Sequence, residues 1–214
     1  MIEVRDSYLV KVKDIREAIL LWQRGRDAIW PDLGWQGRIQ QMLHGHAQQS
    51  LFVWSSEWDD LAAWEAGVKR ARSSVQYEDW TREISELCRY GSEREVFTIL
   101  EPSPSADNRP GRVEVRSSYV VPIARAQKAR EHLRRGMEVE GMSGQCEQML
   151  HGKASQSMFV ISTVFESLAE WDEQIEPAIV LTHEWLAGSK RSAWFEDWCE
   201  IAEFGGSREI FLNL

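Results

Sequence analysis

The sequence is poor in cysteine, has no excess of basic residues and has no long apolar run. Its 214 residues include three cysteines, Cys88, Cys146 and Cys199, none of them in a Cys-x-x-Cys pair. An odd number at this spacing argues against a disulfide framework or a structural zinc site and favours a reducing compartment. Lys and Arg number 25 against 34 Asp and Glu, a net charge of −9, so we expect no nucleic-acid partner.

Other shortages concern membranes and phosphate chemistry. No apolar run is long enough to cross a bilayer, and the first ten residues, MIEVRDSYLV, lack the pattern of a secretory signal. We therefore expect a cytoplasmic protein with no membrane partner. The sequence also lacks a glycine-rich phosphate loop and a nucleophile elbow. Tryptophan, by contrast, occurs 11 times, which is typical of a bulky core or an aromatic-lined pocket.

Five sequence blocks recur in the same order, which indicates a tandem duplication. The paired blocks are IEVRDSYLV (2–10) with VEVRSSYVV (113–121), QQMLHGHAQQSLFV (40–53) with EQMLHGKASQSMFV (147–160), DLAAWE (60–65) with SLAEWD (167–172), YEDW (77–80) with FEDW (195–198), and SEREVF (92–97) with GSREIF (206–211). We predict copy one at 1–100 and copy two at 113–214. The proline-rich segment 101–112 is predicted to be a linker.

Each copy reads as strand, helix, two strands, two helices and a last strand. In copy one, alternation predicts a strand near 2–12, and helical spacing predicts a helix from 15 that ends before Pro31. A hairpin of 38–44 and 50–56 turns around Gly45, and Ser56 to Asp59 resembles a capping box, as does Thr163 to Glu166. This order is the split βαβ motif. We predict an α+β protein of two tandem ferredoxin-like βαββαβ halves packed as a pseudo-dimeric α/β barrel.

The strand order, the LHG hairpin before an apolar strand and the cap leading into SLAEW resemble the dimeric α/β-barrel superfamily. Within it, the chain is most similar to antibiotic-biosynthesis-monooxygenase-like and NIPSNAP-like domains. The run FEDWCEIAEFGGSREIF supports this resemblance. The resemblance implies that the chain is of one of the kinds found in this superfamily. These are cofactor-independent monooxygenases acting on aromatic compounds, isomerases, haem-dependent enzymes and domains without known activity. No catalytic residue set of the family matches residue by residue.

Two residue types repeat at equivalent positions and are candidates for chemistry. His44 and His151 precede the hairpin glycines, where an imidazole could act as a general base or pin the turn. Arg5 and Arg116 alternate with the apolar face of the first strand of each copy. Either could bind a carboxylate or enolate, or form a salt bridge across the barrel. His46 could extend His44 to a metal site, but Lys153 replaces it in copy two, and we expect no metal.

The copies differ most in their aromatic residues, because copy one contains seven tryptophans and copy two four. We predict that any ligand site lies in copy one near Trp35, Trp54 and His44, with Arg5 as an anion partner. The connection PDLGWQGR (31–38) could fold over its mouth. The alternative is that these aromatic side chains fill the core.

Three functions remain open at this stage. The first is a binding protein for a small apolar or aromatic molecule, extending to a cofactor-independent monooxygenase-like enzyme. The second is a non-catalytic assembly or regulatory scaffold. The third is a haem-dependent enzyme with His183 as its ligand; otherwise we expect no cofactor. A barrel closed within one chain permits a monomer and leaves further homo-oligomerisation open.

Overall fold

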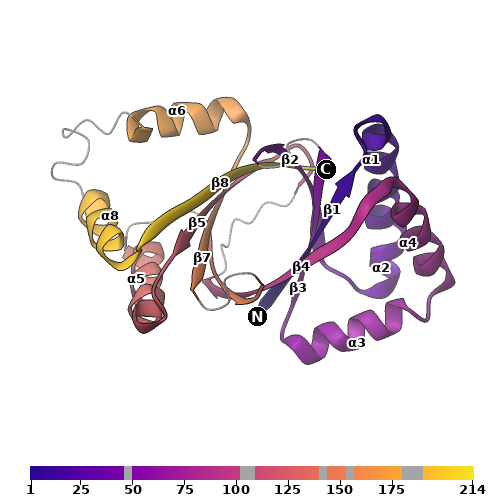
Figure 1. Cartoon of the computed structure of the whole chain (residues 1–214), viewed down its shortest axis with the longest axis horizontal. Helices are drawn as coiled ribbons and strands as arrows, with labels where there is room; N and C mark the ends of the chain where they lie inside the picture. The colour runs from indigo at the N-terminus through magenta and orange to yellow at the C-terminus, as the bar shows by residue number, and fades with distance from the viewer. Residues whose placement is uncertain (46–49, 102–108, 140–143, 153–156, 180–189) are drawn as a thin grey trace. The chain divides into compact units, whose positions relative to one another are not determined.

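The computed structural model describes residues 1–45, 50–101, 109–139, 144–152, 157–179 and 190–214 (Figure 1). The chain divides into two compact units. Unit 1 contains Met1–Thr98 and also Glu209–Leu214. Unit 2 contains Gly111–Arg208 together with the segment Ile99–Asp107. The last residues of the chain therefore group with the first unit.

Unit 1 is a four-stranded antiparallel sheet with helices on one face (Figure 1). The strands are hydrogen-bonded in the order β2-β3-β1-β4, and the end of β8 pairs with the free side of β2. Its elements are β1 (Ile2–Val10), η1 (Val12–Asp14), α1 (Ile15–Arg24), η2 (Gly25–Ile29), α2 (Trp30–Leu33), β2 (Gly37–His44), β3 (Leu51–Trp58), α3 (Leu61–Ala71), α4 (Val75–Leu87) and β4 (Cys88–Glu101).

The described elements of unit 2 follow the order of unit 1 except that none corresponds to η2 and α2, and β7 pairs antiparallel with both β5 and β6. Its elements are β5 (Val113–Val120), η4 (Ile123–Arg125), α5 (Ala126–Val139), β6 (Gln145–His151), β7 (Met158–Phe165), α6 (Leu168–Ile179), α8 (Lys190–Ile201) and β8 (Phe204–Asn213). The full strand order, β1-β3-β2-β8-β5-β7-β6-β4, returns to its start, which is the connectivity of a closed barrel. The predicted α+β fold is confirmed.

The first helical segment of unit 1 runs further than the sequence predicts. After α1 the helix changes to π-helical geometry in η2 and then continues as α2, which has Pro31 in its first turn. A proline is tolerated there because its missing N–H would have had no intrahelical acceptor. The helix ends at Gly34, whose φ of 67° lies in the left-handed region that glycine adopts without strain.

Both predicted capping boxes are wrong by a few residues. In unit 1, β3 continues to Trp58 because its last residues still pair with β1, and the Ser56 hydroxyl accepts a bond of 2.9 Å from the Trp58 indole. Asp60 is the N-cap of α3 and accepts from the Ala63 N–H at 2.8 Å. In unit 2, Ser167 accepts from the backbone N–H of Glu170.

The two faces of the unit 1 sheet differ in chemistry. Even-numbered residues of β1, such as Val4 and Val10, contribute to apolar clusters, whereas Glu3 and Arg5 are buried on the opposite face. The largest apolar cluster lies between the sheet and helices α1, α2 and α4. No described helix is long and apolar enough to cross a membrane.

Candidate functional site

Unit 1 concentrates indole rings between its sheet and its helices. We call this group the tryptophan cluster. Rigid elements supply most of it, since one ring comes from α1, one from α2, two from β3 and one from α4. One further ring comes from the connection between α2 and β2. Its members are Trp22, Trp30, Trp35, Trp54, Trp58 and Trp80.

The rings of the tryptophan cluster contact one another closely. Trp54 is central, because its ring centroid lies 4.9 Å from Trp30, 5.0 Å from Trp35 and 5.4 Å from Trp80. Trp30 stacks on Trp54, whereas Trp80 meets it edge to face. Trp22 instead stacks on Phe52 at 4.6 Å. Such aromatic pairs add about 0.5–1.5 kcal/mol each beyond their buried area.

Two indole N–H groups of the cluster have acceptors and four do not. Trp80 donates to the Leu21 carbonyl at 2.8 Å, and Trp58 donates to the Ser56 hydroxyl. The buried N–H groups without an acceptor among the described residues belong to Trp22, Trp30, Trp35 and Trp54. A buried donor without an acceptor costs about 1–3 kcal/mol, so four in one cluster are unusual. An oxygen or nitrogen acceptor from outside the chain would satisfy them.

Glycine allows the helices to approach the rings of the cluster. A Cβ at Gly25 would lie 2.3 Å from the Trp80 ring, and a Cβ at Gly67 would lie 2.2 Å from the Trp58 ring. Gly25 begins the π-helical turn, a feature that occurs often at functional sites. These positions therefore require glycine for the cluster to close.

A polar group borders the cluster on the same face of the sheet. Arg94 on β4 binds Asp6 on β1 through two nitrogens, at 2.8 and 3.1 Å. The charges of Asp6 and Arg94 act on the phenols of Tyr8 and Tyr77. Tyr77 also contacts Trp35, with ring centroids 5.3 Å apart. The polar edge thus places two phenols and an ion pair beside the indoles.

Both phenols at this edge hold their protons tightly. Burial, and next the negative charge of Asp6, raises the pKa of Tyr8 far above its ordinary value. The same two causes raise the pKa of Tyr77. At neutral pH each phenol is therefore a hydrogen-bond donor and not a base. Cys88 lies nearby at the start of β4, and burial raises the pKa of its thiol to about 11.

The described residues of unit 2 do not reproduce the tryptophan cluster. Within the first repeated block Ser117 replaces Asp6, and extending the blocks without gaps places Leu133 opposite Trp22 and Ile161 opposite Trp54. The sequence prediction that any site lies in copy one rests on the same asymmetry, and the described contacts concentrate the unpaired indoles there.

Unit 2 instead contains a stack built on His132. The imidazole is parallel to the Trp194 ring, with centroids 4.9 Å apart, and it donates through Nε2 to the Trp194 carbonyl at 2.9 Å. Trp194 returns a bond from its indole to the His132 carbonyl at 3.1 Å and packs over Gly136. Burial lowers the pKa of His132, so the ring is neutral at pH 7. Nothing in the sequence around this histidine marks it as a site residue.

The structure brings together two of the three predicted ligand-binding residues. Trp35 and Trp54 are both buried and in contact. His44 is exposed at the end of β2, opposite Ile210, whereas Trp54 pairs with Ile39, five positions earlier on the same strand. That separation is about 16 Å at strand spacing.

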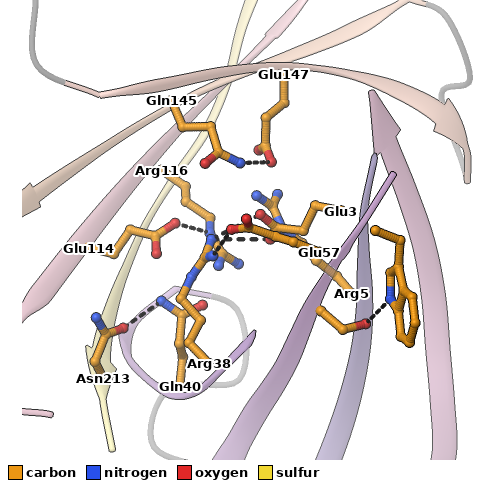
Figure 2. A network of polar contacts seen from close by, with 12 residues as sticks. Glu3, Arg5, Arg38, Gln40, Glu57, Glu114, Arg116, Gln145, Glu147 and Asn213 are labelled. Atoms are coloured by element: carbon orange, nitrogen blue, oxygen red, sulfur yellow. Dashed lines mark hydrogen bonds and ion pairs between the residues drawn. The ribbon is translucent and has the colours of Figure 1, made fainter. Parts of the chain in front are cut away.

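Arg5 is buried on the other face of the sheet from Trp54, because it pairs with Ser55 while Asp6 pairs with Trp54. Its Nε donates to Glu3 at 2.6 Å, and Arg38 contacts both oxygens of the same carboxylate at 3.1 Å (Figure 2). The ion pair of Arg5 is thus with a neighbour on its own strand and differs from the bridge across the barrel that the sequence analysis considers. The contact between Arg38 and Glu3 joins strands that are far apart in the sequence, so no local pattern predicts it.

The equivalent residues of unit 2 are also paired. Arg116 donates to Glu114 at 2.7 Å, and Gln145 donates to Glu147 at 2.7 Å (Figure 2). His151 is exposed at the end of β6. His46 and His183, on which the metal and haem alternatives depend, lie outside the described residues.

The polar edge of unit 1 was only partly visible in the sequence. Tyr77 and Trp80 stand out by their helical spacing, but that pattern is typical of a core. The pairing of Asp6 with Arg94 joins two strands that are far apart in the chain, so no local motif could reveal it.

Three solved structures resemble the chain along its whole length. A candidate monooxygenase from Lactobacillus acidophilus NCFM has a TM-score of 0.66 at 11% identity, covering 100% of this chain and 92% of that chain. A candidate monooxygenase from Fusobacterium nucleatum has a TM-score of 0.67 at 10% identity, with the same coverage. An anthrone oxidase-like protein has a TM-score of 0.61 at 9% identity, covering 100% of this chain and 91% of that chain.

Identities this low establish a shared fold and nothing finer. The chain shares the fold of these three structures, in agreement with the α+β fold that the sequence predicts. No protein-family model and no curated protein matches the sequence.

Proposed function

We propose that unit 1 binds a small planar aromatic molecule that carries a hydrogen-bond acceptor, at the tryptophan cluster. The observation that carries this proposal is that four buried indole N–H groups of the cluster have no acceptor among the described residues. Indole faces favour a planar aromatic ring, and their N–H groups can only donate. The complementary ligand therefore offers π surface and an acceptor oxygen or nitrogen.

The polar edge supports the same kind of ligand. Tyr8 and Tyr77 remain protonated at neutral pH, so their hydroxyls can donate to an acceptor on the molecule. The Asp6–Arg94 pair fixes the charge at this border, because a two-point ion pair holds both side chains in place. Ligand pockets typically combine such an apolar lining with a few placed polar groups.

Oxygenation of the bound molecule is a second candidate, supported by the names of the structures with a similar fold. Oxidation of anthrone to anthraquinone by O2 places one oxygen atom in the new carbonyl and releases the other as water. Without a cofactor the substrate must first lose a proton to a base. At the polar edge Asp6 is bound to Arg94 and the phenols hold their protons, so the geometry favours binding over catalysis.

A matched pair of probes tests the binding proposal. Quinoline and naphthalene have the same shape, but only quinoline carries a ring-nitrogen acceptor. Each is titrated against the protein with tryptophan emission as the readout. We expect quinoline to bind at least as tightly as naphthalene despite its greater affinity for water, because a buried N–H left unpaired is costly. Binding of neither probe would refute the proposal.

Oxygen uptake distinguishes binding from catalysis. The protein is mixed with anthrone in an oxygen electrode, beside an Asp6→Asn variant. The binding proposal predicts no uptake above the protein-free rate. Uptake that disappears in the Asp6→Asn variant would replace it with a catalytic function.

A further inference from the structure

Trp35 differs from every other member of the tryptophan cluster in its position on the chain. The other indoles are attached to helices or to β3, whereas Trp35 belongs to the short connection after α2. Gly34 precedes it with a left-handed φ of 67°, and a Cβ there would meet nothing within 4 Å. The backbone beside Trp35 therefore has open space on one side.

The Trp35 ring fits a well-defined site. It is tilted against Trp54 at 5.0 Å, and it meets Trp58 at 6.0 Å and Tyr77 at 5.3 Å edge to face. We call the space between these three rings the Trp35 seat. Its walls come from β3 and α4, which are regular elements, so the seat keeps its shape if the Trp35 ring leaves it.

The seat also offers hydrogen-bond donors that Trp35 itself does not satisfy. The indole N–H of Trp54 is buried and has no acceptor in the described part of the chain, although the Trp35 ring packs against the Trp54 ring. An indole has a donor but no acceptor, so the Trp35 ring fills the seat without accepting a hydrogen bond from the Trp54 N–H. The Trp35 N–H is unpaired in the same way.

We propose that Trp35 occupies the seat of the ligand, and that the ligand is a planar molecule of two fused rings with an acceptor atom, which displaces the Trp35 ring. This inference rests on the proposed function and specifies its ligand class. A two-ring molecule replaces the indole without changing the walls, and its acceptor pairs with the Trp54 N–H. A single ring leaves part of the seat empty, and three fused rings exceed the indole that the seat now holds.

Competition with Trp35 makes a quantitative prediction. When a binding site is open in only a fraction of molecules, the apparent affinity falls by that fraction. If the Trp35 ring fills the seat in about nine molecules of ten, removing it strengthens ligand binding about tenfold. The gain is confined to ligands that fit the seat.

Titration calorimetry with pyridine, quinoline and acridine tests the inference, because each carries one ring nitrogen on one, two or three fused rings. The wild-type chain is compared with Trp35→Ala and with Trp171→Ala, a matched control on α6 of unit 2 whose buried indole N–H is also unpaired. We expect Trp35→Ala to bind quinoline about tenfold more tightly than the wild-type chain. Pyridine and acridine should gain less, and Trp171→Ala should bind like the wild-type chain.

A second measurement covers the case in which Trp35→Ala folds poorly. Quinoline should then raise the Tm of Trp35→Ala by more than it raises that of the wild-type chain, and Trp35→Phe should show the affinity gain in a stable chain. Equal quinoline affinity in all variants would overturn the displacement of Trp35 and leave the proposed function standing. No binding of any probe to any variant would remove the proposed function as well.

Discussion

Replacing Gly25 by alanine tests whether the tryptophan cluster depends on close contact between helix and ring. An alanine Cβ at this position would lie 2.3 Å from two atoms of the Trp80 ring, which is fully buried. The ring cannot simply turn aside, because its N–H donates to the Leu21 carbonyl at 2.8 Å. Trp80 must therefore shift, and Trp30 and Trp54 contact it.

The expected cost follows from three contributions. Forcing an extra methyl into a packed core costs about 1–3 kcal/mol. Lengthening the bond from Trp80 to the Leu21 carbonyl, without breaking it, costs about 1 kcal/mol more. Alanine recovers about 1 kcal/mol through its better helix propensity. We therefore expect Gly25→Ala to lower the free energy of unfolding by about 1–3 kcal/mol.

Urea unfolding followed by tryptophan emission measures this change. Gly205→Ala is the control, because a Cβ there meets nothing within 4 Å, and it should unfold like the wild-type chain. Gly136→Ala in unit 2 should cost less than Gly25→Ala, since the ring it meets, Trp194, is only half-buried, although its N–H also donates to a backbone carbonyl, that of His132. A Gly25→Ala chain as stable as the wild type, with unchanged emission, would refute the packing argument.

Three further predictions concern charge and protonation. Glu3→Gln should lower the free energy of unfolding of unit 1 by about 3–5 kcal/mol in urea, because it leaves buried cations facing a neutral amide. Glu57→Gln, at a more exposed carboxylate, should cost less, and equal costs would contradict this reasoning. Burial lowers the pKa of His132 below 6.5, so as the pH falls the unfolded chain binds this proton before the folded chain does, and the free energy of unfolding should decrease below pH 6.5. A His132→Gln chain should lose less stability over that range. Parallel curves of stability against pH for the two chains would contradict the lowered pKa of His132. Thiol-reagent labelling of Cys88 should speed up until the pH approaches about 11, and a plateau near pH 9 would show an ordinary thiol.

The sequence predicts the order of elements well because local patterns encode it. The hairpin of β2 and β3 and the helix Val75–Leu87 follow from alternation and helical spacing, and both are present. Errors occur where a side chain had a competing partner. Ser56 lies within β3, where its hydroxyl accepts a bond from the Trp58 indole, and Asp60 caps α3 in its place.

The candidate site was predictable only in part. The excess of tryptophan in the first copy points to Trp35 and Trp54, and the structure places them in contact. The sequence cannot reveal that Arg5 and Trp54 lie on opposite faces, because that depends on which residues of β1 and β3 pair. Nor can it show which indole N–H groups lack acceptors, since the acceptor of Trp80 is a backbone carbonyl on another helix.

Chemical shifts of the indole N–H protons test the central claim most directly. The chain contains 11 tryptophans, each with one indole N–H signal, and single Trp→Phe variants assign them. On addition of quinoline, the account predicts that the Trp54 signal moves downfield as its N–H gains an acceptor and that the Trp35 signal changes as its ring leaves the cluster. The signals of Trp171 and Trp198, in unit 2, should stay in place. Quinoline-induced shifts at Trp171 or Trp198 with none at Trp54 would contradict the account.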